Sequence, residues 1–165
     1  KNKFKNYFLV VSRLVKYKKV DLVVETFNEL ESPLLVIGTG REEKKLKRKA
    51  KKNIHFIGHV RDEELATYYK NARALIFPQE EDFGITAVEA QMYGIPVIAY
   101  KKGGAMDTVN RQTGVFFDEQ NKKSLLDAIY KFGKRKFNKK VIKENAKKFS
   151  KRRFKNEFLQ LIKSL

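Results

Sequence analysis

The sequence predicts an α/β protein: a doubly wound, Rossmann-like parallel sheet of six strands with a helical C-terminal tail. Segments of strand character alternate with segments of helical periodicity six times along the 165 residues. The strand segments are continuous apolar runs, which is typical of parallel strands covered on both faces. If the crossovers are right-handed and the strand order is 3-2-1-4-5-6, ligands bind outside the carboxyl ends of strands one and four.

The elements follow from apolar runs, helical stripes and turn residues taken in chain order. Asp62 is expected to cap the third helix, and the last helical region is expected to break near residues 133–138 and 150. The expected strands cover residues 7–11, 34–37, 54–57, 74–77, 96–100 and 115–117. The expected helices cover residues 20–30, 42–52, 63–71, 85–93, 104–109 and 124–165. All of them are expected to form one domain over residues 1–165, which is long enough for a real core.

The stretch P-Q-E-E-D-F-G-I-T-A-V-E, residues 78–89, contains the loop after the fourth strand and the beginning of the next helix. It places the free amides of Phe83, Gly84 and Ile85 at a helix N-terminus, where an anionic ligand can accept their hydrogen bonds. Glu89 lies one turn inside the helix and leans toward the same end, which Glu81 flanks. Amides suit phosphate and carboxylates suit hydroxyl groups, so a sugar nucleotide fits. An ordinary acidic cap explains the cluster equally well.

Two cations leave the first strand close to this loop in the predicted topology. Arg13 and Lys18 are candidates for a diphosphate clamp, although both could be solvated loop charges. The second strand ends in a G-x-G formed by Gly38 and Gly40, which are candidate donor-binding residues. That motif lacks the third glycine of the dinucleotide fingerprint and follows the wrong strand, so NAD binding is not expected.

The turn after the third strand is a candidate nucleobase site. The backbone of Gly58, His59, Val60 and Arg61 could hold a base edge, with the valine against the ring, but a tight turn without a ligand is equally plausible. His55 lies inside the strand and is expected to be structural. The chain has no cysteine and only two histidines, so no transition-metal site is expected.

In its motifs and their order, the chain resembles the C-terminal domain of the retaining GT-B glycosyltransferases of family 4, which carry an E-x7-E motif, here Glu81 and Glu89. The match covers nearly all 165 residues. The E-D-F-G-I form resembles the branch that includes bacterial and archaeal mannosyltransferases of surface-polysaccharide assembly. The matching pieces are R-L with the lysine at 18, V-I-G-T-G at 36–40, I-H-F-I-G at 54–58, the 81–90 stretch, G-I-P-V-I-A at 94–99, G-G at 103–104 and T-G at 113–114.

This resemblance implies a nucleotide-sugar donor-binding domain of a hexosyltransferase. By position, Arg13 and Lys18 would bind the diphosphate, Glu81 the transferred sugar and Glu89 the ribose. The amides of residues 83–85 would bind phosphate and sugar, and the turn at 58–61 the base. Glu81, Arg13 and Lys18 are the expected catalytic residues. Such enzymes need no metal or other cofactor, GDP-mannose is the first expectation for the donor, and the acceptor would be a glycan or a lipid-linked sugar.

Three departures from the family pattern stand out. Asp82 replaces a common glycine, and Asp107 stands where a glutamate is usual. The chain also begins at the first strand of the donor half, so we expect the N-terminal acceptor domain to be a missing partner. The isolated fragment should then bind donor weakly and transfer nothing, and residues 139–165 should be partly unsupported.

The formal net charge of +18 leaves other functions open. It favours polyanions, so a basic nucleic-acid-binding Rossmann-like module is one alternative, although acidic groups in the best cleft make nucleic acid an unlikely partner. A GT-B sugar-nucleotide epimerase is another. The lysine runs at 44–52 and 131–155 could be solvated helix faces or could bind an anionic membrane. No 18-residue apolar run or signal peptide is visible, so a cytoplasmic protein is expected, peripheral at the inner face of the membrane if it binds there.

Overall fold

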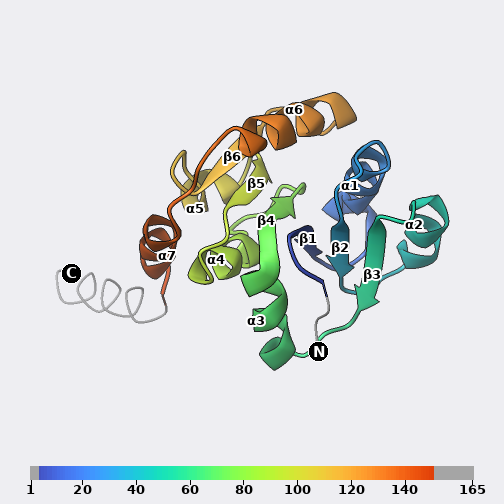
Figure 1. Cartoon of the computed structure of the whole chain (residues 1–165), viewed down its shortest axis with the longest axis horizontal. Coiled ribbons are helices and arrows are strands. Elements are labelled where there is room, and N and C mark those ends of the chain that lie inside the picture. The colour runs from blue at the N-terminus through green and yellow to red at the C-terminus, as the bar shows by residue number, and fades with distance from the viewer. Residues whose placement is uncertain (1–3, 151–165) are drawn as a thin grey trace, which may run out of the picture.

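A six-stranded, wholly parallel sheet forms the centre of the computed structural model, which describes residues 4–150 (Figure 1). The strand order is β3-β2-β1-β4-β5-β6, which confirms the predicted order and fold class. The strands are β1 (Tyr7–Val11), β2 (Leu34–Ile37), β3 (Ile54–Gly58), β4 (Ala72–Phe77), β5 (Val97–Tyr100) and β6 (Gly114–Phe117). Each lies within two residues of the segment that the apolar runs predict.

The helices alternate with the strands as expected, and their ends differ by a few residues. One 3-10 turn, η1 (Lys16–Lys18), precedes the first α-helix. The α-helices are α1 (Val20–Phe27), α2 (Glu43–Lys49), α3 (Asp62–Asn71), α4 (Ile85–Met92), α5 (Ala105–Thr108), α6 (Lys122–Gly133) and α7 (Lys139–Lys147).

The predicted cap of α3 is wrong by one residue. Arg61 has the extended backbone of an N-cap (φ −69°, ψ 149°), and Asp62 is already the first helical residue. No side chain caps this helix. Asp62, Glu63 and Glu64 all lie in its first turn, where negative charge is favourable beside the amide end of the helix dipole.

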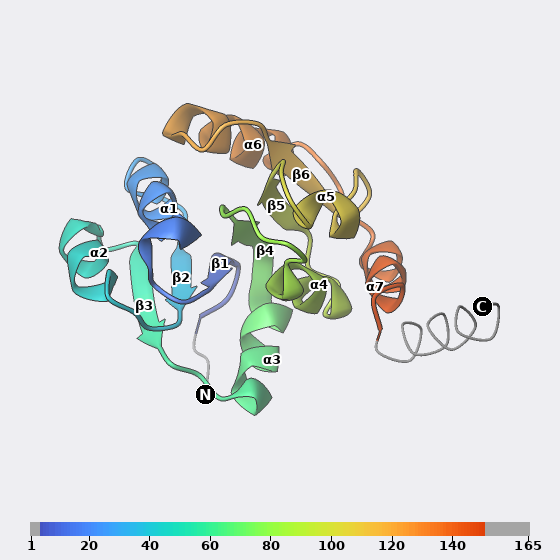
Figure 2. The same ribbon diagram turned by 180° about the vertical axis from the view of Figure 1, so that it is seen from behind.

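Two apolar layers cover the sheet, because successive side chains of each strand point to opposite faces. In β1, Phe8 and Val10 pack with α1, α2 and α6, whereas Tyr7 and Leu9 pack with α3, α4 and α5. Figure 2 shows α1, α2 and α6 together on one side of the sheet and α4 on the other. The chain therefore forms three layers, with the sheet in the middle.

The topological switch lies between β1 and β4, which are hydrogen-bonded neighbours in the sheet. Leu9 of β1 is in register with Leu75 of β4 on one side and with Leu35 of β2 on the other. The chain leaves β1 toward α1 on one face and leaves β4 toward α4 on the opposite face. In doubly wound sheets, ligands bind at this point, outside the carboxyl ends of the two strands.

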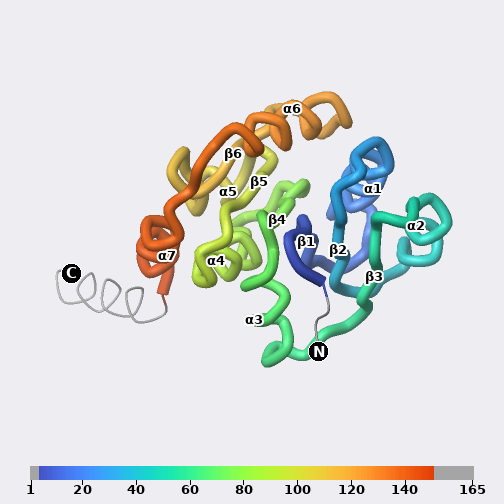
Figure 3. Tube along the Cα trace, in the orientation of Figure 1, coloured from blue at the N-terminus to red at the C-terminus, as the bar shows by residue number. Residues whose placement is uncertain are grey.

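The tail is better supported than predicted where the structure describes it. Helix α7 returns along α4, and Figure 3 shows the two side by side. Asn145 of α7 is buried and its amide donates to Gln91 Oε1 of α4 (2.7 Å) and to the carbonyl of Thr108 of α5 (2.9 Å). This network fixes α7, so the expectation of missing support is wrong for residues 139–147. Residues 151–165 lie outside the described part.

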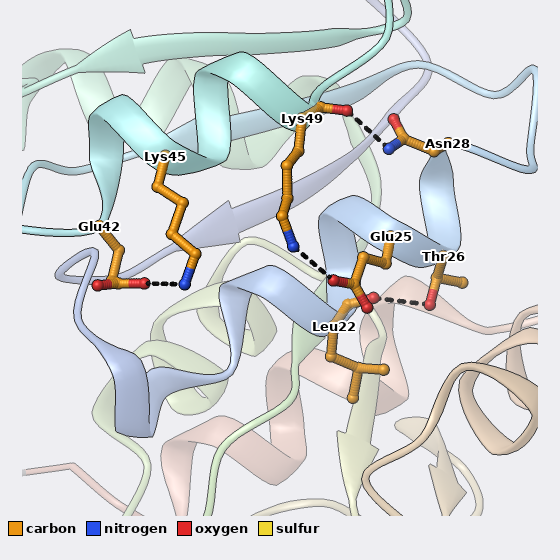
Figure 4. A network of polar contacts seen from close by, with 7 residues as sticks. All are labelled: Leu22, Glu25, Thr26, Asn28, Glu42, Lys45 and Lys49. Atoms are coloured by element: carbon orange, nitrogen blue, oxygen red, sulfur yellow. Dashed lines mark hydrogen bonds and ion pairs between the residues drawn. The ribbon is translucent and has the colours of Figure 1, made fainter.

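Three lysines of the first lysine run form ion pairs with nearby glutamates. Lys45 pairs with Glu42 (3.4 Å), and Lys49 reaches across to Glu25 of α1 (3.1 Å), as Figure 4 shows. Lys47 pairs with Glu43 (2.7 Å). These contacts favour the interpretation of α2 as a solvated helix face. In the described range 4–150, no helix is long and apolar enough to cross a membrane.

Candidate functional site

The loops that follow β1 and β4 meet at the switch point through one ion pair. The ammonium of Lys18, at the end of η1, contacts Oε1 of Glu81 in the β4–α4 loop. Figure 2 shows the dark-blue stretch after β1 and the green loop after β4 at the same edge of the sheet. The predicted convergence of the two loops is therefore confirmed.

The loop after β1 is held by backbone contacts with the loop after β2, which contains Gly38 and Gly40. The amide of Leu14 donates to the carbonyl of Thr39 (2.9 Å), and the amide of Glu42 donates to the carbonyl of Leu14 (2.9 Å). A methyl group on Gly38, which has a φ of 127°, would overlap the carbonyl of Ser12, and one on Gly40 would overlap the backbone of Leu14. The two glycines let the loops after β1 and β2 pack backbone to backbone, which positions the residues that follow β1.

The N-terminus of α4 is open. Gly84 is its N-cap in the left-handed conformation (φ 78°, ψ 55°), and no side chain caps the helix. Among residues 4–150 we find no acceptor for the amides of Phe83, Gly84 and Ile85. The side chains of Phe83 and Ile85 are 45% and 63% exposed. This helix end therefore offers free donors and a positive partial charge beside the Lys18–Glu81 pair.

A second pair of glycines, Gly103 and Gly104, packs against the backbone of residues 81–83, just before the N-terminus of α4. The amide of Gly104 donates to the carbonyl of Glu81 (2.6 Å). A methyl group on Gly104 would overlap the backbone of Asp82 and Phe83, and one on Gly103 would overlap the carbonyl of Glu81. The loop between β5 and α5 thus fixes the backbone of Glu81. Asp107 itself is exposed in the first turn of α5.

The two predicted cations differ in their surroundings. Lys18 is half-buried, and burial, followed by the positive charge of Arg13, lowers its pKa below the usual 10.5. Arg13 is exposed, and its guanidinium donates to the hydroxyl of Tyr17 (2.8 Å). Both cations therefore lie in the chain that follows β1, and Lys18 is the more buried of the two.

Glu81 is held by two groups on one oxygen. The buried Gln79 donates from Nε2 to Glu81 Oε1 (3.2 Å), the same atom that Lys18 contacts. Within the described chain Oε2 has no partner, so it is available to accept a hydrogen bond from a ligand hydroxyl. Gln79 Oε1 is also buried without a partner among these residues.

Glu89 has a separate partner on α3. The hydroxyl of Tyr69 donates to Glu89 Oε2 (3.1 Å). Burial raises the pKa of Glu89, Asp62 adds to this rise, and the tyrosine hydrogen bond opposes it. Burial and the nearby carboxylate also raise the pKa of Tyr69, so its hydroxyl stays a donor at any ordinary pH. Glu81 and Glu89 thus flank the same helix, but each is oriented by a different neighbour.

The turn after β3, which is the predicted base site, is open at Gly58 and packed at Val60. Gly58 has a φ of 80° and nothing within 4 Å of where a Cβ would lie. Its carbonyl accepts from the amide of Gly38 (2.8 Å), which ties the turn to the end of β2. His59 is exposed, and Arg61 contacts Glu64 (3.3 Å). Val60 is partly buried and packs against the core layer on the α3 side.

Three contributing side chains had no separate place in the predicted site. Gln79 contacts Glu81, Tyr17 contacts Arg13, and Tyr69 contacts Glu89. Tyrosine in place of phenylalanine at a buried position is a usable signal, because a buried hydroxyl needs a partner. In the described residues no group of three His, Asp or Glu side chains is placed to hold a metal ion.

The fold, with its topological switch between β1 and β4, defines an α/β domain of the Rossmann-like class found in GT-B enzymes. The chain belongs to the family described as glycosyl transferases group 1, whose match spans residues 1–149. Among solved structures it is similar to HepE from Anabaena, determined in complex with UDP. The TM-score is 0.79 at 21% identity, covering 98% of this chain and 50% of that one.

Two curated relatives carry specific names. The D-rhamnosyltransferase WbpZ of Pseudomonas aeruginosa is 29% identical over 111 residues, covering 63% of this chain and 29% of that protein. A GDP-mannose-dependent monoacylated alpha-(1-6)-phosphatidylinositol monomannoside mannosyltransferase of Corynebacterium glutamicum is 32% identical over 120 residues, covering 63% and 32%. The chain thus spans about a third of the length of the curated relatives that it matches.

Proposed function

We propose that this chain is the donor-binding domain of a retaining hexosyltransferase and that it binds a nucleotide diphosphate sugar at the β1–β4 switch. The observation that carries this proposal is the contact of Lys18 with Glu81 beside the open N-terminus of α4. A cation, a carboxylate and a row of free amides meet there. Amides and an ammonium suit a diphosphate, and the carboxylate suits the hydroxyl groups of the attached sugar.

The roles follow from the position of each group. The diphosphate lies between Lys18, Arg13 and the amides of residues 83–85. Transfer breaks the bond between the anomeric carbon and the diphosphate oxygen and forms one to an acceptor hydroxyl oxygen, while the hydroxyl proton departs with the leaving group. The two cations and the helix end stabilise the charge that develops on the diphosphate, and no metal or other cofactor is required.

The two glutamates hold opposite ends of the donor. Glu89 accepts from the ribose hydroxyls, and Tyr69 orients its carboxylate. Glu81 accepts from a hydroxyl of the transferred sugar through Oε2. The turn at residues 58–61 receives the base, with its open face at Gly58. Gly38 and Gly40 act through the backbone that carries Arg13 to the site.

GDP-mannose is our proposed donor. The mannosyltransferase from Corynebacterium supports this donor, whereas the rhamnosyltransferase from Pseudomonas favours a different hexose. The identity of the transferred sugar is therefore the first property to test. A separate N-terminal domain completes the acceptor site for a glycan or a lipid-linked sugar, and these 165 residues alone transfer nothing. The enzyme acts in the cytoplasm, where its lysines allow peripheral contact with an anionic membrane.

A calorimetric screen of GDP-, UDP- and ADP-sugars against the full chain tests the proposal. Glu89→Ala should weaken binding of the bare nucleotide by about tenfold, which corresponds to roughly 1.4 kcal/mol. Glu81→Ala should mainly abolish the difference between the sugar nucleotide and the bare nucleotide. Glu63→Ala, at an exposed site on α3, is the control and should change neither. The roles are wrong if the two variants behave in reverse, and the function is wrong if no nucleotide binds.

A further inference from the structure

A groove of about 520 Å³ opens next to the Lys18–Glu81 pair and has no role in the donor site. Three parts of the chain line it: η1 with the residue after it, the β4–α4 loop and the β6–α6 loop. The lining residues are Lys16, Tyr17, Lys19, Glu80 and Gln120. Its volume falls within the roughly 300–1,000 Å³ that is usual for small-molecule sites.

The polar groups of this groove are mostly uncommitted. Within residues 4–150, Lys16, Lys19 and Glu80 have no ion-pair or hydrogen-bond partner through their side chains. Gln120 is different, because its Nε2 donates to the carbonyl of Pro78 (2.9 Å). That bond fixes the amide and leaves its oxygen as an acceptor. On α2, by contrast, Lys45, Lys47 and Lys49 each pair with a glutamate.

Two further features fit a ligand with both apolar and hydroxyl surface. The side chain of Tyr17 is 54% exposed, although its hydroxyl is already used as the acceptor for Arg13. The ammonium of Lys18 lies over the Tyr17 ring, 5.1 Å from its centroid, so the ring is held in place and its other face is the one offered for stacking. Lys19 adopts the left-handed backbone conformation (φ 55°, ψ 29°), which is uncommon for a residue with a long side chain and is found more often at functional sites.

We propose that this groove binds the acceptor, as a saccharide that carries an anionic group. The ring of Tyr17 stacks on the apolar face of the sugar, Glu80 and Gln120 accept its hydroxyl protons, and Lys16 and Lys19 bind the anion. The groove adjoins the donor site, since Glu80 precedes Glu81 and Tyr17 contacts Arg13. A hydroxyl held here lies next to the transferred sugar. This proposal depends on the proposed function, because only group transfer requires a second substrate at this place.

The test uses chemical-shift titrations of the full chain saturated with GDP. The probes are mannose 6-phosphate, methyl α-mannoside and inorganic phosphate. We expect mannose 6-phosphate to bind with a Kd in the millimolar range, at least threefold tighter than either other probe, and to shift the amides of Tyr17, Glu80 and Gln120. Lys16→Ala/Lys19→Gly should weaken its binding about tenfold while the Kd for GDP stays within twofold. Glycine at position 19 keeps the left-handed backbone without strain.

Lys44→Ala/Lys52→Ala is the matched control, because it removes the same charge from exposed lysines elsewhere and should change the Kd by less than twofold. Glu80→Gln should weaken the neutral and the charged sugar alike. The proposal is overturned if the control loses as much affinity as the groove variant, if inorganic phosphate binds as well as the sugar phosphate, or if the sugar phosphate displaces GDP. Failure of GDP itself to bind would reject the proposed function instead, and the groove would then be titrated without it.

Discussion

Lys18 Nζ and Glu81 Oε1 form an ion pair across the switch point, so the cation proposed for the diphosphate contacts the carboxylate proposed for the sugar. If Lys18 binds the diphosphate as proposed, a bare nucleotide competes with Glu81 for that ammonium. A sugar nucleotide would offset this competition by donating a hydroxyl hydrogen bond to Glu81. The ion pair would then disfavour the nucleotide product relative to the sugar-nucleotide donor.

The first prediction follows from this competition. Glu81→Gln should tighten binding of bare GDP about threefold, because Lys18 is released and a negative charge near the phosphates is lost, and it should remove the preference for the sugar nucleotide. Calorimetry with GDP and GDP-mannose measures both effects. Glu144→Gln, which removes a similar ion-paired charge from α7, should leave both affinities unchanged. A loss of GDP affinity in Glu81→Gln would show that Glu81 supports the nucleotide rather than the sugar.

A second prediction concerns pH. Because burial and Arg13 lower the pKa of Lys18 from 10.5, GDP affinity should decrease with rising pH before ordinary exposed lysines lose their protons. Lys18→Arg keeps the charge at every accessible pH. The ratio of the Kd values of the two proteins between pH 7 and 10 cancels the titration of the ligand itself. That ratio should change by several-fold in favour of the arginine variant, and a flat ratio would argue against diphosphate binding by Lys18.

The sheet was predictable because parallel strands buried on both faces must be continuously apolar, and β1 and β2 match their predicted ends. The convergence of Lys18 with Glu81 also followed from strand order. The hydrogen bonds to the individual carboxylate oxygens could not be predicted from the sequence. Gln79 binds Glu81 and Tyr69 binds Glu89 because tertiary packing brings these side chains together. The end of α1 at Phe27 and the support of α7 by Asn145 depend likewise on tertiary contacts rather than on local periodicity.

The third prediction separates stability from binding at Glu89. Its raised pKa means that the folded state favours the protonated form, so the stability it contributes is present at low pH and is lost as pH rises through that raised pKa. Glu89→Gln should therefore raise the Tm at pH 7, by roughly 2 °C for about 0.5–1 kcal/mol, and less at pH 4.

Binding should move the other way in the same variant. The amide can still accept from Tyr69, but it is a weaker acceptor for ribose, so GDP affinity should fall severalfold. Thermal melts with and without GDP record both quantities. Glu63→Gln on the exposed side of α3 is the control and should change neither. A variant that is both less stable and weaker in binding would mean that Glu89 is a structural residue.

The last prediction tests the support behind the open end of α4. A methyl group on Gly104 meets the backbone of Asp82 and Phe83, and backbone cannot give way as a flexible side chain can. Gly104→Ala should cost roughly 1–3 kcal/mol and lower the Tm by roughly 2–10 °C. Because the displaced segment carries the amides proposed for the phosphate, GDP binding should fall by more than tenfold even at temperatures where the variant is fully folded. Gly133→Ala is the matched control, since nothing lies within 4 Å of its added methyl, and it should be neutral or slightly stabilising. Full retention of GDP affinity in a destabilised Gly104→Ala would show that the amides of residues 83–85 do not bind the nucleotide.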